Sequence, residues 1–166
     1  NPTVGLMSNG VEEEKGTDFT KETFSLIQDH VDSGKATFDW RGNVEGYDLF
    51  MSKLDVCLCD GFVGNVVLKT CGATAKAMTK WIREAMSANP MRIAGACLAK
   101  GGFSAVKDRM NYETYGGSPL LGVNGVCIIA HGSSSSLAIQ NAIRVAAEAI
   151  QHDVNPHIVT AMKAIA

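Results

Sequence analysis

The sequence predicts an α/β fold with a mainly parallel sheet flanked by helices. Short apolar or β-rich runs at 3–7, 37–40, 56–59 and 126–130 alternate with stretches of helical periodicity, which is the order that βα units produce. The chain has 166 residues, 46% of them hydrophobic and 19% charged, so it can bury an ordinary core. No repeat or linker is visible, and we expect residues 1–166 to form a single unit.

Composition and charge exclude several classes of function. The formal net charge is only −2, which provides no basic footprint for nucleic acid, so we expect no nucleic-acid partner. Apolar runs are shorter than the roughly 18 residues of a membrane span. The five cysteines form no CxxC pair, and nucleotide and zinc-protease fingerprints are absent, so no metal or cofactor is predicted. These features together predict a protein of the reducing cytoplasm.

Apolar periodicity predicts two long helices. One follows Asn65, with a stripe that we expect to pack on the sheet; it consists of Leu68, Cys71, Ala75, Met78, Ile82 and Met86. The other runs from about Ser133 to Ile150 and is also amphipathic. Asn-Pro pairs at 89–90 and 155–156 join a capping side chain to a proline, so each is predicted to start a helix.

Residues 91–110 are predicted to form an amphipathic helical protrusion, two short helices hinged at Gly101-Gly102. Its apolar positions are Ile93, Leu98, Phe103 and Val106, and its polar positions are largely basic. We expect these apolar side chains to pack in a dimer or in the core. The alternative is peripheral contact with an anionic membrane at its inner face.

The segment DGFVGNVVLK at 60–69 is the first candidate site. It lies between a predicted strand and a helix, where backbone N–H groups and the helix dipole attract anions such as phosphate. Gly61 and Gly64 allow close approach of a ligand, and Asn65 caps the helix or binds phosphate. In the alternative interpretation the glycines only make a tight turn, which Asp60 caps.

A second turn repeats this pattern after the last apolar run, with His131, Gly132 and Ser133 before a helix. A parallel sheet would bring both turns to one edge. Ser133 is a better helix cap than nucleophile, because no GxSxG elbow is present.

Two further turns carry charged side chains. Lys15 and Gly16 follow three glutamates, between the first predicted strand and a helix whose predicted cap is Asp18. This lysine neutralises a bound phosphate, or it belongs to a solvated loop. Lys69 is a weaker candidate. In RGNVEGYD at 41–48, Glu45 orients a lysine or a backbone amide, or the segment is a plain surface turn.

The glycine-rich segment 115–125 is predicted to form a loop rather than a regular strand. It lines a substrate channel or covers the core.

Several motifs occur in a fixed order: VGLMSNGVEEEKG at 4–16, GNVEG at 42–46, CDGFVGNVVLKT at 59–70, YGGSPLLGVNGV at 115–126 and AHGSS at 130–134. Together they resemble the PlsX family of phosphate acyltransferases over nearly the whole chain. The resemblance implies a fold related to phosphotransacetylase and isocitrate dehydrogenase. The chain begins at Asn1 without an initiator methionine, and we expect it to be the C-terminal half of a longer enzyme.

The resemblance also implies an activity and partners. Members of that family transfer a fatty acyl group from acyl carrier protein to inorganic phosphate and form homodimers. Their acyl phosphate serves phospholipid synthesis, which implies a downstream glycerol-phosphate acyltransferase as a further partner. In three places the chain departs from the family pattern: Thr17 replaces an asparagine, Tyr47 an arginine and Ser135 an aspartate.

A direct attack of phosphate on the thioester is the mechanism we expect, because no activated serine or cysteine is visible. Lys15, Glu45 and Asn65 are the predicted catalytic residues. Phosphate is predicted to contact Gly16, Asp60, Gly61, Gly64, Lys69, His131, Gly132 and Ser133. The alternatives are an acyltransferase that uses coenzyme A thioesters, a non-catalytic binding or dimerisation fragment, and a peripheral membrane module.

Overall fold

The computed structural model describes residues 1–110, 114–130, 132 and 134–165. The chain divides into two compact units, Asn1–Thr79 and Lys80–Ala166. Each unit is described by itself. The predicted organisation of residues 1–166 as one unit stays a prediction.

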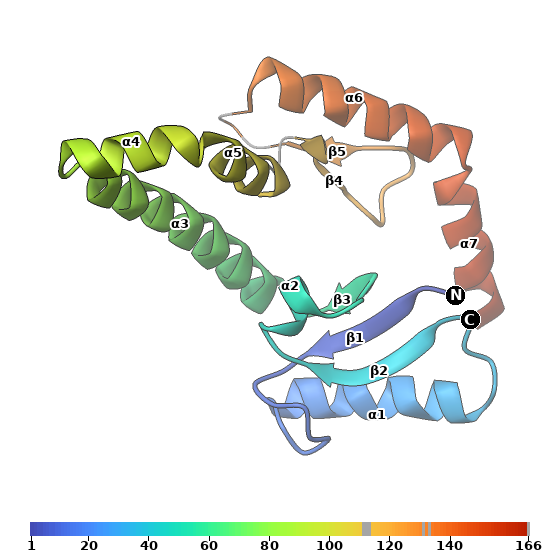
Figure 1. Cartoon of the computed structure of the whole chain (residues 1–166). Helices are drawn as coiled ribbons and strands as arrows, with labels where there is room; N and C mark the ends of the chain where they lie inside the picture. Colours follow the sequence, from blue (N-terminus) through green and yellow to red (C-terminus); the bar gives the residue numbers. More distant parts are fainter. Residues whose placement is uncertain (111–113, 131, 133, 166) are drawn as a thin grey trace. The chain divides into compact units, whose positions relative to one another are not determined.

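A parallel sheet forms the centre of the first unit and confirms the α/β prediction. Strands β1 (Thr3–Met7), β2 (Asp39–Val44) and β3 (Val56–Leu58) pair in the order β2-β1-β3. The central strand β1 runs parallel to both neighbours (Figure 1). The predicted run at 3–7 is confirmed, whereas the strand expected at 37–40 begins later and extends to Val44.

Strand β2 continues further than predicted, since Asn43 and Val44 pair with Leu6 and Met7, and it contains a bulge. The register shifts between Val4 and Leu6, whose partners are Trp40 and Asn43, so β2 holds an extra residue there. Gly42 has φ of 73°, a conformation that glycine adopts without steric cost. The segment 41–44, predicted as part of a turn, therefore belongs to the strand.

Helix α1 (Asp18–Asp32) packs along β2. Buried Phe24 stacks at a tilt on Trp40 with 5.8 Å between ring centroids, and Trp40 Nε1 donates to Gln28 Oε1 at 3.1 Å. Thr17 caps the helix, its Oγ1 accepting from Thr20 N. The prediction that Asp18 is the cap was wrong, because this residue lies in the first turn of α1. Its negative charge there still interacts favourably with the helix dipole.

The second unit contains an antiparallel pair, β4 (Ser118–Pro119) and β5 (Ile128–Ile129). We predicted the run 126–130 as a strand of the parallel sheet, and this was wrong for the described residues. The chain reverses within the intervening residues, and Leu120 N donates to Cys127 O at 2.8 Å. Pairing with a near neighbour costs less loop-closure entropy than pairing with a distant strand.

Helix α6 (Ser136–Gln151) packs on β5 and leads into α7 (Val154–Ile165) (Figure 1). Ser135 caps α6, its Oγ accepting from Ala138 N at 3.3 Å. The predicted start near Ser133 was therefore too early. A helix does start at the pair Asn155-Pro156, as predicted, but Asn155 is not its cap: this residue lies inside the first turn of α7, and its Nδ2 donates to Gly125 O.

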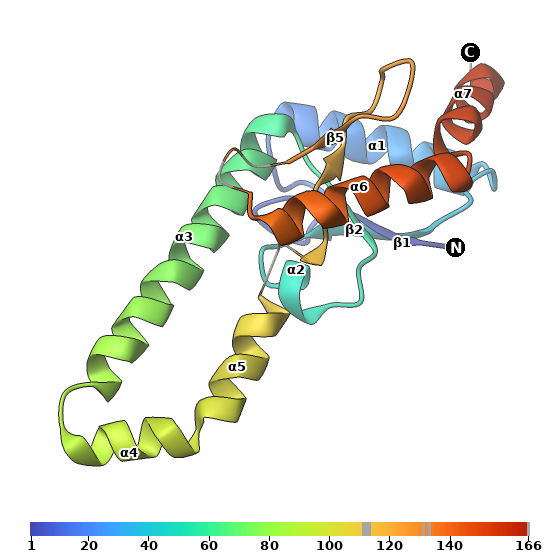
Figure 2. The ribbon, with the colours of Figure 1, turned by 90° about the horizontal axis from the view of Figure 1, so that it is seen from above.

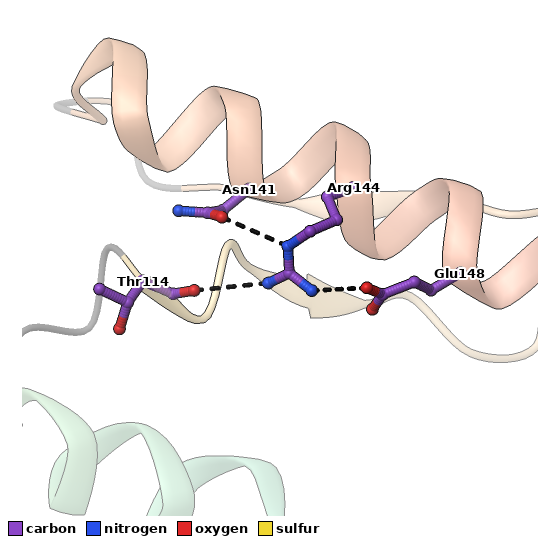
Figure 3. A network of polar contacts seen from close by, with 4 residues as sticks. All are labelled: Thr114, Asn141, Arg144 and Glu148. Carbon is purple, nitrogen blue, oxygen red and sulfur yellow. Dashed lines mark hydrogen bonds and ion pairs between the residues drawn. The ribbon is translucent and has the colours of Figure 1, made fainter.

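Arg144 ties α6 to the segment before β4 (Figure 3). Its Nη1 pairs with Glu148 Oε1 at 2.6 Å, its Nε donates to Asn141 Oδ1 at 3.3 Å and its Nη2 donates to Thr114 O at 3.5 Å. Next to this network, buried Gly116 lies directly against the backbone of α6. A Cβ there would lie 2.5 Å from both C and O of Asn141.

Helix α3 (Gly61–Met86) does not bury the stripe that we expected to cover the sheet. Leu68, Met78 and Ile82 are 75%, 51% and 43% exposed, so that prediction was wrong. A helix of this length extends about 39 Å at 1.5 Å per residue. The three-residue β3 that precedes it offers only a short surface for packing.

Helices α4 (Pro90–Leu98) and α5 (Lys100–Arg109) form the predicted amphipathic pair (Figure 2). Asn89 caps α4 through Arg92 N at 2.9 Å with Pro90 in the first turn, as predicted. The break lies at Ala99 rather than at Gly101-Gly102, because Ala99 ends α4 and begins α5. Among the described residues, no helix is both long and apolar enough to cross a membrane.

Candidate functional site

The carboxyl ends of β1, β2 and β3 lie at one edge of the first unit's sheet because the strands are parallel. The loop 8–17 follows β1, the turn at Glu45 follows β2, and Asp60 with the start of α3 follows β3. We call this edge the carboxyl edge. The chain passes from β2 across the central β1 to β3, so a topological switch point lies between β1 and β3. Ligands of open α/β sheets bind at such points.

Lys15 is exposed in the loop that follows the central strand. Its backbone N donates to Glu12 O at 3.1 Å. The stem of its side chain crosses Gly10, where a Cβ would lie 2.7 Å from Lys15 Cγ. Gly16 has φ of 99°, and a Cβ would lie 2.9 Å from Thr20 Cβ. The positive φ of Gly16 thus favours glycine at that position, and at Gly10 a larger residue would displace the Lys15 side chain. Contact of Gly16 with phosphate stays a prediction.

Two polar residues that sequence reasoning missed lie beneath this loop. Ser8 N donates to Val44 O at 2.9 Å, and Asn43 Nδ2 donates to Glu12 O at 2.7 Å. Ser8 Oγ and Asn43 Oδ1 are buried without a hydrogen-bond partner in the described part of the chain. The available signal was an asparagine, a residue depleted in strands, next to apolar positions of a strand.

Glu45 is exposed at the end of β2. Its backbone N donates to Asp48 Oδ2 at 2.8 Å, and Asp48 begins the short helix α2 (Asp48–Met51). Hydrogen bonds from the Ser52 hydroxyl and then from Glu45 N hold the pKa of the Asp48 carboxyl below its usual value. Tyr47, which stands where the resembled family has arginine, is 68% exposed. The role predicted for the Glu45 side chain stays a prediction.

Asp60 caps α3, which confirms the alternative interpretation of its side chain. Its Oδ1 accepts from Phe62 N at 2.8 Å and Val63 N at 3.0 Å, and its O accepts from Gly64 N. The helix begins at Gly61 rather than after Asn65, so Asn65 is not its cap. Because the Asp60 carboxylate already accepts hydrogen bonds from these N–H groups, the start of α3 by itself attracts a further anion only weakly.

The start of α3 gives its remaining candidate residues different surroundings. A Cβ on Gly61 would meet no atom within 4 Å, whereas one on Gly64 would lie 2.8 Å from Cys59 Sγ. Gly64 thus serves close packing within the chain, and Gly61 leaves open space. Asn65 is exposed in the second turn of the helix. Because α3 begins at Gly61 rather than after Asn65, Lys69 lies about 12 Å along the helix from its first residue. This is further from the carboxyl edge than the predicted helix start implied.

Cysteine chemistry is disfavoured at β3. Burial, followed by the nearby Cys59 and Asp48, raises the pKa of the Cys57 thiol. A raised pKa leaves less of the nucleophilic thiolate at neutral pH. The five cysteines are free thiols. The described residues contain no group of three or more histidine, cysteine or acidic side chains that is arranged to hold a metal ion.

The second predicted turn belongs to the second unit. Gly132 is exposed between β5 and α6, while His131 and Ser133 lie outside the described residues. Their joint contact with phosphate stays a prediction. Ser135, which replaces an aspartate of the resembled family, caps α6 as Thr17 caps α1. Both departures therefore keep a side-chain oxygen where a helix start needs one.

Comparison with known proteins covers almost the whole chain. A family model described as fatty acid synthesis protein matches residues 1–157. A phosphate acyltransferase of Akkermansia muciniphila is 58% identical over 157 residues, which are 95% of this chain and 45% of that protein.

Two further phosphate acyltransferases are each 44% identical. The one from Leptospira biflexa aligns over 160 residues, 95% of this chain and 45% of that protein. The one from Pelotomaculum thermopropionicum aligns over 164 residues, 99% of this chain and 46% of that protein. The chain spans about half the length of these curated relatives and matches their C-terminal part. The chain therefore belongs to the fatty acid synthesis protein family, the PlsX family that its motifs resemble.

Proposed function

We propose that the protein transfers an acyl group from a thioester to inorganic phosphate and so makes an acyl phosphate for phospholipid synthesis. The observation that carries this proposal is the 58% identity to a protein named phosphate acyltransferase. The family match includes the complete carboxyl edge of the first unit. This edge supports a small anionic substrate because it combines a lysine loop, an open glycine and the start of a helix at a switch point.

The residues of the carboxyl edge suit a direct transfer. A phosphate oxygen attacks the thioester carbonyl carbon, the new C–O bond forms, and the C–S bond breaks as the thiolate leaves and takes up a proton. Lys15 neutralises the phosphate or the oxyanion that develops. Gly16 and Gly61 let backbone N–H groups approach, and Asn65 donates from the first turns of α3. Holding both reactants in place contributes up to about 7–11 kcal/mol in favourable cases.

The remaining predicted residues take supporting roles in this proposal. Glu45 orients the lysine from the neighbouring strand end. Asp60 holds the first turn of α3 through its cap, and Gly64 allows that turn to pack on Cys59. Lys69 contributes least, because about 12 Å of helix separates it from Gly61.

We expect acyl carrier protein to be the preferred donor, in line with the PlsX resemblance. The test supplies the complete protein with phosphate and the same acyl chain on acyl carrier protein or on coenzyme A. A carrier-protein preference of at least about tenfold in kcat/KM, about 1.4 kcal/mol, supports the proposal. Equal or reversed preference favours the coenzyme A alternative. Phosphate binding without any acyl phosphate from either donor favours a non-catalytic binding protein.

A homodimer is the second part of the proposal. Met91, Ile93, Leu98, Phe103 and Val106 form the α4–α5 apolar surface, and Met91 and Leu98 are 85% and 90% exposed. Burying a leucine or phenylalanine side chain contributes about 1.5–3 kcal/mol, so a second copy that covers this surface gains stability.

Replacing Leu98 and Phe103 together by aspartate should raise the dissociation constant of the dimer at least about tenfold. The loss of a single buried apolar side chain is already enough for a change of this size. Sedimentation equilibrium of the complete protein measures this effect. Leu26→Asp, which charges an apolar residue of α1 that is 66% exposed, is the matched control. An unchanged dimer together with lost binding to anionic vesicles would instead assign the surface to a membrane.

A further inference from the structure

Asn43 is the one polar residue among the buried residues of the described chain, with 4% of its surface exposed. It lies one position before the end of β2 and pairs with Leu6 of the central strand. Burying an amide costs about 1–3 kcal/mol when its hydrogen bonds are not replaced, and Asn43 Oδ1 has no partner within the described residues. A buried asparagine at this position therefore needs an explanation.

The side chain of Asn43 reaches the loop that carries Lys15. Its Nδ2 donates to Glu12 O at 2.7 Å, and Lys15 N donates to the same oxygen at 3.1 Å. The Glu12 carbonyl thus joins the end of β2 to the turn 12–15. This contact links residues 31 positions apart, while Glu12 and Lys15 themselves are exposed. The buried Nδ2 of Asn43 therefore holds the turn 12–15 against the end of β2.

The neighbouring glycines Gly10 and Gly16 restrict the conformation of the chain around Lys15. The Lys15 stem crosses Gly10, and the following Gly16 turns back with φ of 99° against Thr20 and Ser8 Oγ. A backbone fixed on both sides of Lys15 leaves mainly rotation of its own side chain. Fixing the backbone in advance lowers the entropy lost when the ammonium engages an anion.

We propose that Asn43 is a positioning residue that holds the turn 12–15 so that Lys15 is presented at the carboxyl edge for phosphate. This inference rests on the proposed function. Asn43 acts through Lys15: its amide is buried, and its donor group is already bound to Glu12 O. Its contribution to turnover should therefore disappear when the lysine is removed.

Two substitutions remove the hydrogen bond from Asn43 Nδ2 to Glu12 O in different ways. Asn43→Asp keeps the shape of the side chain but replaces the donor by a carboxylate facing a carbonyl oxygen. Asn43→Leu has a similar size and removes both polar atoms, so it provides a variant without a buried charge. Val4→Ala is the matched stability control, since Val4 is 8% exposed at the opposite end of the sheet, beside Trp40 and Val56.

A double-mutant cycle in the complete protein tests the coupling. We expect Asn43→Leu and Asn43→Asp to lower kcat/KM for phosphate at least about tenfold, and to change it less than about twofold when Lys15→Ala is already present. Val4→Ala should change kcat/KM less than about twofold at a comparable loss of stability. The inference would be overturned if the Asn43 substitutions lowered kcat/KM equally in the presence and absence of Lys15. It would also be overturned if Val4→Ala lowered kcat/KM as much as they do.

Amide hydrogen exchange provides a readout that does not depend on turnover. We expect the peptide covering residues 8–17 to exchange at least about tenfold faster in the Asn43 variants, while the peptide covering 21–32 of α1 keeps its rate. Unchanged exchange in 8–17 would overturn the inference. If the wild-type protein makes no acyl phosphate, the proposed function fails, and the exchange rates still decide whether Asn43 holds the turn.

Discussion

Replacing Lys15 by alanine in the complete protein should lower kcat/KM for phosphate by about 10²- to 10³-fold, the usual loss when one group that stabilises developing charge is removed. The reason lies in the start of α3. Asp60 already occupies the N–H groups of Phe62 and Val63, so the helix end alone attracts an anion weakly. In the proposed mechanism, the exposed ammonium of Lys15 supplies positive charge at this edge of the sheet.

The measurement is acyl phosphate formation at varied phosphate concentration. Lys35→Ala is the matched control, because Lys35 is also exposed but lies in the loop between α1 and β2, at the opposite edge of the sheet. Circular dichroism checks that Lys15→Ala is folded. Near-normal turnover in a folded Lys15→Ala protein would remove this lysine from the mechanism.

Gly116→Ala should lower the free energy of unfolding by about 2–5 kcal/mol, the sum of a strained backbone and an overpacked contact. Gly116 has φ of 89°, and a Cβ would lie 2.5 Å from the C and O atoms of Asn141 in α6. Backbone atoms of a helix cannot move aside as a flexible side chain does. The segment carrying Thr114 must therefore separate from α6, which also breaks its contact with Arg144.

Gly122→Ala separates the two contributions. Gly122 also has positive φ, 81°, but a Cβ there meets nothing within 4 Å. We expect this substitution to cost only about 1–2 kcal/mol from backbone strain. Urea unfolding followed by circular dichroism measures both variants. Equal costs for Gly116→Ala and Gly122→Ala would show that the close approach to α6 is not what makes Gly116 necessary.

Features that depend on neighbouring residues were predicted well. The strand at 3–7, the amphipathic pair between Met91 and Met110 and the cap at Asn89 were all visible in the sequence. Each depends on residues within a few positions: apolar periodicity, an asparagine before a proline, or a short β-rich run. The candidate loop at Lys15 was found for the same reason, since the chain order placed it directly after a strand.

Errors arose where two local signals competed. Asp60 and Asn65 are both good caps, and the glycines between them suggested a turn rather than the first turn of a helix. The hydrogen bonds of Asp60 decide for the earlier start. The same problem affected Thr17 and Asp18. The Thr17 hydroxyl caps α1, and Asp18 is the first residue of the helix.

Local sequence patterns were sufficient to predict the α/β class, the order of the main elements and the loop that carries Lys15, because periodicity and capping act over a few residues. The three-dimensional fold was needed to establish the strand order β2-β1-β3, the bulge at Gly42, and the burial of Asn43 with its hydrogen bond to the Lys15 turn. It also showed that Leu68, Met78 and Ile82 of the α3 stripe stay exposed. These features depend on contacts between distant residues, and no local pattern records which distant residue will be the partner.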